Sequence, residues 1–284
     1  MNGEVKIIRP GIYTSIQDLG RFGFSKYGIP KSGAMDQMSV KLANAILGND
    51  ENDAVLEWTM QGPILQFSEQ TIIVLTGAEV DAFLNKKKIK KNKQFSVDKN
   101  DILELKYCKN NMYGYVGIKN GFKTEITFNS RSFFKGITRL EKLKKGDVVP
   151  YQKNENFEEQ YASVLRQDYD QNSLVLKAFK GPEFDLLTSS EKESLKNMNF
   201  TISNIRSRMA IQLNETIVNK ISSMLTSPVL PGTIQLTPSG KLIVLMRDCQ
   251  TTGGYPRILQ LFQEDINNIA QKRTGENIKF KIIT

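Results

Sequence analysis

The chain has 284 residues, of which 39% are hydrophobic and 9% aromatic, enough to bury a core in one large domain or two smaller ones. It contains no histidine, which excludes Ser-His-Asp and Cys-His nucleophile systems and histidine-ligated metal sites. Cys108 and Cys249 are too few for a disulfide framework and lack CxxC spacing, so we expect reduced thiols and no metal site. Any chemistry must use Asp, Glu, Lys, Tyr, Arg or backbone amides.

The net charge is +9, and its densest part is "NKKKIKKNK" at residues 85–93. This run lies between two apolar segments, which predicts a solvated hairpin turn and not a surface that binds nucleic acid. No stretch approaches the roughly 18–20 apolar residues of a membrane span, and the start "MNGEVKIIRP" lacks the apolar segment of a signal peptide. We therefore expect a cytoplasmic protein that binds neither nucleic acid nor membrane.

Alternating apolar positions predict a succession of β-strands along the chain. The runs are, in order, "VKIIRP", "TIIVLTG", "DILELKY", "MYGYVGIKNG", "SLVLKAF", "TIQLTP", "KLIVLM" and "NIKFKII". With few helices and no βαβ repetition, the pattern predicts a mainly β fold built from barrels or sandwiches.

Three helices are expected between these strands. The first covers 36–47, with Asp36 as its N-cap and Gly48 as its C-terminal stop. The second begins in "LTSSEKESLKNM" (187–198), where Thr188 with Glu191, or Ser190 with Glu193, has capping-box spacing. The third covers about Glu264 to Gln271.

A polar, weakly patterned segment divides the chain into two mostly β halves. We expect a linker at about 150–172, between an N-terminal half at 1–160 that contains one helix and a C-terminal half at 172–284.

Three segments combine glycines with polar side chains at the ends of strands. The first, "TSIQDLGRFGFSKYGIPKSGAMD" (14–36), offers hydrogen-bonding groups and one fixed cation on Gln17, Asp18, Arg21, Ser32 and Asp36. Loops of this length are uncommon unless functional, although a surface loop with Asp36 as a cap and Asp18 paired to Arg21 is the alternative.

The second segment, "LEWTMQGP" (56–63), carries Glu57 beside the single tryptophan. An acid in an apolar strand can have a raised pKa and transfer protons, whereas an ordinary ion-pair partner is the alternative.

The third segment, "MRDCQTTGGYP" (246–256), follows an apolar strand. Backbone N–H groups around Gly253 and Gly254 are expected to form an anion-binding nest, surrounded by hydrogen-bonding groups of Gln250, Thr251, Thr252 and Tyr255. A tight turn is the alternative. The chain has neither a phosphate loop nor a GxGxxG turn between a strand and a helix.

Taken in order, these segments resemble the KipA family, which is also called allophanate hydrolase subunit 2, the C component of 5-oxoprolinase or the biotin-dependent carboxyltransferase family. The resemblance runs nearly end to end and is carried by "GIYTSIQDLGRFGFSKYGIPKSGAMDQMSVKLANAILGN", "AVLEWTMQGPILQF", "VLTGAE", "GPEFD", "SRM", "GTIQLTPSGKLIVLMRDCQTTGGYPRI" and "AQKRTGENIKF".

The resemblance implies two cyclophilin-like β-barrel halves and a companion B subunit of the KipI type. With a LamB-type A subunit, such a complex uses ATP to open the lactam of 5-oxoproline to L-glutamate. Two alternatives stay open. One is a carboxyltransferase subunit that uses biotin and acts on urea, and the other is a non-catalytic antagonist of a KipI-type kinase inhibitor. ATP is expected to be used by the complex, with no site assigned to this chain.

In the 5-oxoprolinase interpretation, four carboxylates are candidates for proton transfer: Asp18, Asp36, Glu57 and Asp248. Arg21 or Arg208, with the amides near Gly253 and Gly254, is expected to hold the substrate carboxylate or a developing oxyanion. The side chains expected to orient the lactam are those of Gln235 and Gln250, with Gln17, Ser32, Thr251, Thr252 and Tyr255 as further binding residues.

The chain departs from the family pattern in two places. Ala210 and Gln212 stand where the family usually has glycine and arginine, and the segment Asn129–Asp147 keeps Ser130, Ser132 and Arg139 but lacks a glycine-rich insert. The loss of a fixed guanidinium and a flexible loop changes the substrate, or removes catalysis and leaves a regulatory protein.

Overall fold

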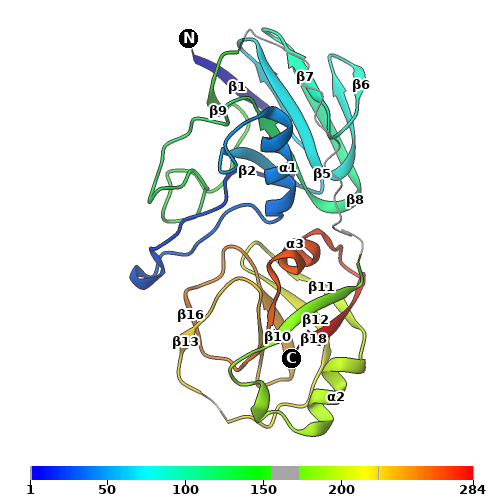
Figure 1. Cartoon of the computed structure of the whole chain (residues 1–284). Helices are drawn as coiled ribbons and strands as arrows, with labels where there is room; N and C mark the ends of the chain where they lie inside the picture. The colour runs from blue at the N-terminus through cyan, green and yellow to red at the C-terminus, as the bar shows by residue number, and fades with distance from the viewer. Residues whose placement is uncertain (1, 155–172, 223, 284) are drawn as a thin grey trace. The chain divides into compact units, whose positions relative to one another are not determined.

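The computed structural model describes residues 2–154, 173–222 and 224–283. The described residues form two compact units (Figure 1). We call residues 2–21 and 32–154 the sheet unit, and residues 22–31, 173–222 and 224–283 the barrel unit. The short segment Phe22–Lys31 therefore belongs to the barrel unit, although the chain on both sides of it belongs to the sheet unit.

The sheet unit is built on nine antiparallel strands. Their main path runs in the order β2-β3-β8-β4-β1-β9, and β5 pairs with β6, β7 and β8. The strands are β1 Asn2–Arg9, β2 Tyr13–Gln17, β3 Val55–Thr59, β4 Ile64–Phe67, β5 Thr71–Leu84, β6 Lys87–Ile89, β7 Gln94–Val97, β8 Ile102–Ile118 and β9 Val148–Gln152.

One long strand, β8, joins two runs that the sequence pattern presents separately. It pairs with β4 through its first residues and with β3 through its last ones, while β5 follows both parts with shifts in register. Asn111 has a φ of 63° within this strand, and such a local irregularity lets a long strand bend. Alternate side chains of these strands fill a core around Ile7, Leu56, Trp58 and Val116.

Helix α1 (Gln37–Leu47) packs on the sheet through Ala43, Ile46 and Leu47, which contact Ile72 and Val74 of β5. The helix begins at Asp36 and stops at Gly48, which has a φ of 61°. Both ends lie where the capping pattern predicts them, because an N-cap carboxylate and a left-handed glycine are local signals.

The barrel unit closes a seven-stranded ring in the order β10-β17-β14-β15-β12-β11-β18, and the parallel pair β10–β18 completes it. The ring strands are β10 Val175–Lys180, β11 Phe200–Arg206, β12 Ala210–Thr216, β14 Thr233–Leu236, β15 Lys241–Leu245, β17 Arg257–Leu261 and β18 Asn277–Ile283. Their inward side chains, such as Leu213, Ile234 and Val244, are fully buried. Closure leaves no free edge in this ring.

The barrel unit also contains shorter elements. They are the 3-10 turns η1 (Ser25–Tyr27) and η2 (Phe184–Leu186), helices α2 (Ser189–Asn197) and α3 (Gln263–Gln271), and the strand pair β13 (Ser227–Pro228) with β16 (Thr252–Gly253). Helix α2 begins with the capping box formed by Thr188 and Glu191, the first of the two predicted pairs.

The prediction of a mainly β protein with barrel-like units is confirmed. The linker does not start at residue 150 as expected, because Val148–Gln152 forms β9 and pairs with β1. The rest of that expected linker lies largely outside the described residues. No helix in the described part of the chain is long and apolar enough to cross a membrane.

Candidate functional site

A row of buried polar side chains crosses the sheet unit. Ser15 lies opposite Glu57, Glu57 opposite Tyr115, and Tyr115 opposite Thr76, on the adjacent strands β2, β3, β8 and β5. Residues directly opposite one another in an antiparallel ladder share a face, so strand register places all four on the same side. None of the four is more than 2% exposed.

Glu57 is the acid of this row, and it binds two donors. Its Oε2 accepts hydrogen bonds from the Met35 N–H at 2.7 Å and from the Tyr115 hydroxyl at 2.9 Å. Burial, followed by the charges of Glu57 and Asp36, holds the pKa of Tyr115 well above its usual value. Tyr115 therefore stays protonated and donates to Glu57, which ties the start of α1 to the sheet.

Asp18 holds the loop at residues 130–132. Its carboxylate accepts from the Ser130 and Ser132 hydroxyls at 2.7 and 2.6 Å, and from the Arg131 and Gly20 N–H groups at 2.6 and 2.8 Å. These donors, and not Arg21, are the partners of Asp18, so the Asp18–Arg21 ion pair of the alternative interpretation is wrong. Arg21 is buried and donates instead to the Ser132 carbonyl.

Asp36 caps α1. One carboxylate oxygen accepts from the N–H groups of Met38 and Ser39 at 3.1 and 3.2 Å, and the other accepts from the Ser39 hydroxyl at 2.6 Å. The preceding residues are fixed in left-handed conformations, with φ of 54° at Ser32 and 95° at Gly33. A side chain on Gly33 would meet the backbone of Leu19 and Gly20 within 3.0 Å, so glycine is required there.

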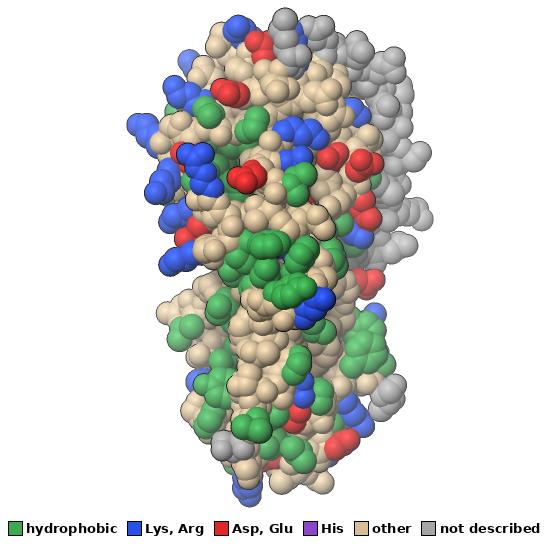
Figure 2. Space-filling model, turned by 90° about the vertical axis from the view of Figure 1, so that its left-hand side faces the viewer, with side chains coloured by type: hydrophobic (Ala, Val, Ile, Leu, Met, Phe, Trp, Pro, Cys, Tyr) green, Lys and Arg blue, Asp and Glu red, His purple; other side chains and the backbone are tan. Residues whose placement is uncertain are grey.

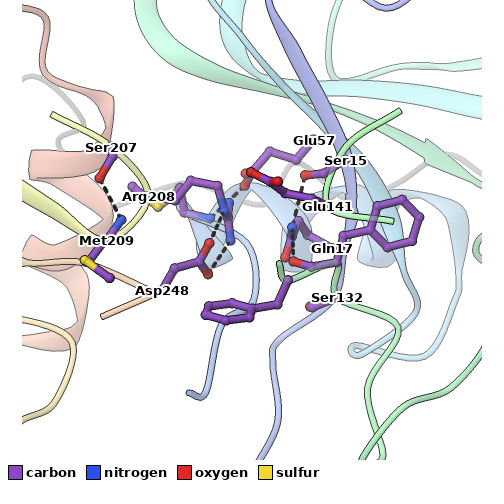
Figure 3. Close-up of polar contacts among 12 residues, drawn as sticks. Ser15, Gln17, Glu57, Ser132, Glu141, Ser207, Arg208, Met209 and Asp248 are labelled. Atoms are coloured by element: carbon purple, nitrogen blue, oxygen red, sulfur yellow. Dashed lines mark hydrogen bonds and ion pairs between the residues drawn. The ribbon is translucent and has the colours of Figure 1, made fainter. Parts of the chain in front are cut away.

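Gln17, next to Asp18, has an unsatisfied atom. Its Nε2 donates to Ser15 Oγ at 3.0 Å and to the Phe133 carbonyl at 3.3 Å, and Figure 3 shows the first of these bonds. Its Oε1 is buried and has no hydrogen-bond partner among the described residues. A buried acceptor without a donor costs about 1–3 kcal/mol, so this oxygen needs an explanation.

In the barrel unit, Arg208 donates two parallel hydrogen bonds to the Asp248 carboxylate, from Nε to Oδ2 at 2.8 Å and from Nη2 to Oδ1 at 3.0 Å (Figure 3). The two side chains are only 8% and 15% exposed. The backbones also pair, since the Asp248 N–H donates to the Arg208 carbonyl at 2.9 Å. A forked pair of this kind is geometrically specific.

Arg247, between Asp248 and the end of β15, is 1% exposed. Its Nη2 donates to Asn267 Oδ1 of α3 at 2.6 Å. Burial, and then the charge of Arg247, lower the pKa of Lys31 from 10.5 to about 8. Lys31 is the last residue of the short segment that belongs to the barrel unit.

The segment around Gly253 is extended, and the predicted anion-binding nest is wrong. Thr252 and Gly253 pair with Pro228 and Ser227, and neither Gly253 nor Gly254 has a positive φ. A nest needs successive N–H groups turned inward by alternating backbone conformations, which a strand does not supply.

Two amide side chains crowd Gly253 instead. A Cβ on Gly253 would lie 2.7 Å from Gln235 Nε2 and 3.2 Å from Gln250 Nε2, so glycine gives both amides room. Gln235 is buried, and its Nε2 donates to the Tyr255 carbonyl at 3.4 Å. The exposed residues Thr252, Gly254 and Tyr255 border this amide pair, and Thr251 is half-buried.

The predicted site residues thus fall into two groups, one within each unit. The sheet unit brings together Gln17, Asp18, Arg21, Ser32, Asp36 and Glu57, and the barrel unit brings together Arg208, Gln235, Asp248 and the segment Gln250–Tyr255. Sequence reasoning did not assign Tyr115 or Lys31 to a site. Pairing of the two predicted strands would place Tyr115 opposite Glu57, and this could have identified Tyr115. Nothing in the sequence distinguishes Lys31 from the other lysines. The described residues contain no cluster of three acidic or sulfur side chains able to hold a metal ion.

Comparison with known proteins finds a match at residues 27–282 to the family model described as "Carboxyltransferase domain, subdomain A and B". The chain is 32% identical to the C component of the 5-oxoprolinase of Escherichia coli, covering 97% of this chain and 90% of that protein. It is 30% identical to the same component of the 5-oxoprolinase of Haemophilus influenzae, covering 95% and 88%. A urea amidolyase of Lachancea kluyveri is 36% identical over 51% of this chain and 8% of its own length.

Two solved structures share the fold. The urea amidolyase of Kluyveromyces lactis superimposes with a TM-score of 0.85 at 24% identity, covering 99% of this chain and 19% of that one. The urea carboxylase of the same yeast gives a TM-score of 0.85 at 24% identity, covering 99% and 27%. The chain therefore corresponds to a minor part of each of those longer proteins.

Proposed function

Because this chain belongs to the family of carboxyltransferase domains with subdomains A and B, we propose that it is the C component of an ATP-dependent 5-oxoprolinase. In this reaction water is added across the lactam C–N bond of 5-oxoproline, and L-glutamate is formed by the C component together with A and B subunits. The observation that carries the proposal is the nearly end-to-end similarity to the C components of two bacterial 5-oxoprolinases.

The proposal gives the polar groups of the sheet unit distinct roles. Gln17 Oε1 is a buried oxygen that can accept a hydrogen bond from the lactam N–H. The ring fixes this amide in the cis orientation. Glu57 is the acid proposed for proton transfer, since it is buried and already hydrogen-bonded to a protonated tyrosine. Asp18 and Asp36 act as positioning residues, because their oxygens bind the 130–132 loop and the first turn of α1.

Within the barrel unit, Gln235 and Gln250 are the amide side chains proposed for ligand binding, since both converge at Gly253. Asp248 is the second acid proposed for proton transfer, held in place by Arg208. When bound, ATP supplies the free energy for opening a stable amide, and we assign its binding to the complex without naming residues of this chain.

The test is reconstitution. The purified chain is mixed with a KipI-type B subunit and a LamB-type A subunit, given 5-oxoproline and ATP, and assayed for glutamate. We expect glutamate only when all three proteins and ATP are present. If the C component from E. coli restores turnover with the same A and B subunits while this chain does not, the proposal is wrong.

A biotin-dependent carboxyltransferase is the second candidate, favoured by the similarity to a urea amidolyase over half of the chain. It requires a biotin carboxylase and a biotin carrier in trans. A parallel assay supplies urea, bicarbonate, ATP and these two proteins. Carboxylation of urea without glutamate formation from 5-oxoproline would replace the first function by the second.

A further inference from the structure

Ser15 and Gln17, on strand β2 of the sheet unit, both have hydrogen-bonding capacity that the described residues do not use. They lie two residues apart on one strand, so their side chains are on the same face of the sheet. Both residues are fully buried. They also contact each other, because Gln17 Nε2 donates to Ser15 Oγ at 3.0 Å (Figure 3). We call these two residues the Ser15–Gln17 pair.

The hydrogen bonds that the Ser15–Gln17 pair already makes determine what remains available. Ser15 Oγ accepts one hydrogen bond, and its hydroxyl proton has no acceptor among the described residues. Gln17 Oε1 has no donor among them. The Phe133 carbonyl fixes the orientation of the Gln17 amide, because a carbonyl oxygen only accepts and must therefore face the NH2 group. One buried donor and one buried acceptor are thus left on adjacent side chains.

A donor beside an acceptor is the complement of an amide whose N–H and C=O point to the same side. A lactam ring and urea both have this arrangement, whereas the N–H and C=O of an ordinary trans peptide point in opposite directions. The ligand N–H would donate to Gln17 Oε1, and the ligand carbonyl would accept from the Ser15 hydroxyl. A single amide therefore satisfies both unused groups, in a buried place where water does not compete for these hydrogen bonds.

The acid proposed for proton transfer lies next to this pair. Glu57 is directly opposite Ser15 in the β2–β3 ladder, and residues in such positions have Cβ atoms about 4.5–5.5 Å apart. The other two hydroxyls of the polar row are already used as donors. Tyr115 donates to Glu57 at 2.9 Å, and Thr76 donates to the Ser39 carbonyl at 2.8 Å. Of the hydroxyls in this row, that of Ser15 is the one left to donate to a ligand.

We propose that Ser15 and Gln17 together form a binding site for a cis amide, in which Ser15 is the donor to the carbonyl oxygen of the ligand. The identification of this amide as the lactam of 5-oxoproline rests on the proposed function, and urea has the same chemistry. The site belongs to a single strand of the sheet unit. Because both groups are shielded from solvent, a ligand enters only after a local opening, and its association is slower than diffusion.

The first experiment measures ligand binding to the full chain labelled with 15N. It follows the side-chain NH2 signals of Gln17 by NMR, and the Gln17→Leu variant assigns them. 2-Pyrrolidinone, a lactam without a carboxylate, should shift these signals in a saturable manner. γ-Butyrolactone, which has the same ring with an oxygen in place of the N–H, should not shift them at the same concentrations. Equal binding of the lactone and the lactam overturns the proposal.

A titration with urea distinguishes the two sources of the amide. Saturable binding of 2-pyrrolidinone in preference to urea supports a lactam site. Saturable binding of urea in preference to the lactam retains the cis-amide site and assigns it to the second candidate function. If neither compound shifts the Gln17 signals, the proposal is overturned, because a bound water then satisfies the two groups.

Variants of Ser15 test its part in the site. Ser15→Ala should weaken the binding of 2-pyrrolidinone roughly tenfold, because the ligand carbonyl loses its donor. Ser15→Thr keeps a hydroxyl and should restore much of the affinity. The matched control is Thr59→Val in the same unit, since the Thr59 hydroxyl donates to the Met112 carbonyl at 3.0 Å. This control should lose stability and keep the affinity. An affinity of Ser15→Ala equal to that of the unchanged chain contradicts the proposal.

A further experiment in the reconstituted complex separates this inference from the proposed function. Ser15→Ala should raise the KM for 5-oxoproline roughly tenfold and change kcat less, because a contact made in the ground state is lost. If the complex forms no glutamate but the chain binds 2-pyrrolidinone and not γ-butyrolactone, the amide site stands and the reaction is different. If glutamate forms and Ser15→Ala has an unchanged KM, the reaction stands and the amide site is wrong.

Discussion

At the scale of single residues, the adjacent residues Gln17 and Asp18 differ in whether their side-chain oxygens have hydrogen-bond donors. Asp18 has four donors on its carboxylate, from Gly20 and the 130–132 loop. Gln17 donates through its Nε2, but its Oε1 has no donor in the described structure. A saturated carboxylate holds a loop in place, whereas a buried unsatisfied oxygen keeps a capacity to bind.

The Gln17→Leu variant tests this difference. We expect its free energy of unfolding to change by less than about 1 kcal/mol, because removal of an unpaired acceptor offsets the loss of two hydrogen bonds. We expect the KM for 5-oxoproline in the complex to rise roughly tenfold, because the lactam N–H loses its acceptor. Urea denaturation and steady-state kinetics measure the two effects.

Gln94→Leu is the control for that substitution. Gln94 also lies in the sheet unit, and its amide donates to the Ile46 carbonyl at the end of α1. It should lose stability and keep its KM. If Gln17→Leu behaves in the same way, then Gln17 is a structural residue.

At the scale of elements, the start of α1 connects the candidate residues of the sheet unit. Glu57 binds the Met35 N–H, Tyr115 accepts from the Asp36 N–H at 2.8 Å, and the Ala34 N–H donates to the Asp18 carbonyl at 2.9 Å. Three successive residues before the helix are therefore fixed by three different segments. The position of α1 and the geometry of the polar row depend on each other.

Asp36→Ala should destabilise the protein by about 1–2 kcal/mol, because the first turn of α1 loses its side-chain cap. Asp36→Asn retains an oxygen that accepts from the backbone and should recover most of that loss. Thermal unfolding followed by circular dichroism compares the two variants. A stability of Asp36→Asn as low as that of Asp36→Ala would show that the charge of Asp36 matters more than its capping bond.

At the scale of the whole molecule, the net charge is +9. On the face drawn in Figure 2, Lys and Arg side chains over the sheet unit are interspersed with Asp and Glu. The lysine run includes the turn between β5 and β6, where Asn85 and Lys86 have positive φ. Within this run Lys88 pairs with Asp81 at 2.7 Å. Like most exposed ion pairs, this one contributes little to stability.

A charge-reduced variant tests the role of this run. Replacement of the exposed Lys87, Lys90 and Lys93 by Gln lowers the net charge from +9 by three, to +6. We expect the melting temperature to change by less than about 2 °C, because exposed lysines away from special contacts contribute little. We also expect turnover in the reconstituted complex to be unchanged. A large fall in turnover without loss of stability would show that the run contacts another protein of the complex.

Much of this organisation could be predicted from the sequence, because its signals act over a few residues. The caps at Asp36 and Thr188, the stop at Gly48 and the alternation of the strands each depend on neighbours in the chain. The family pattern also indicated most of the polar residues that gather in each unit. The nest at Gly253 and Gly254 was wrong because a TTGG sequence is compatible with a strand as well as a turn, and pairing with β13 decided between them.

The sequence by itself determined the mainly β character, the ends of the helices and the exclusion of histidine chemistry. Only the tertiary structure decided the partners of the buried carboxylates: Tyr115 for Glu57, and the 130–132 loop for Asp18. These partners are separated by many tens of residues. Their meeting depends on strand register and on the way loops fold back, and a one-residue shift in register would move each side chain to the opposite face of the sheet.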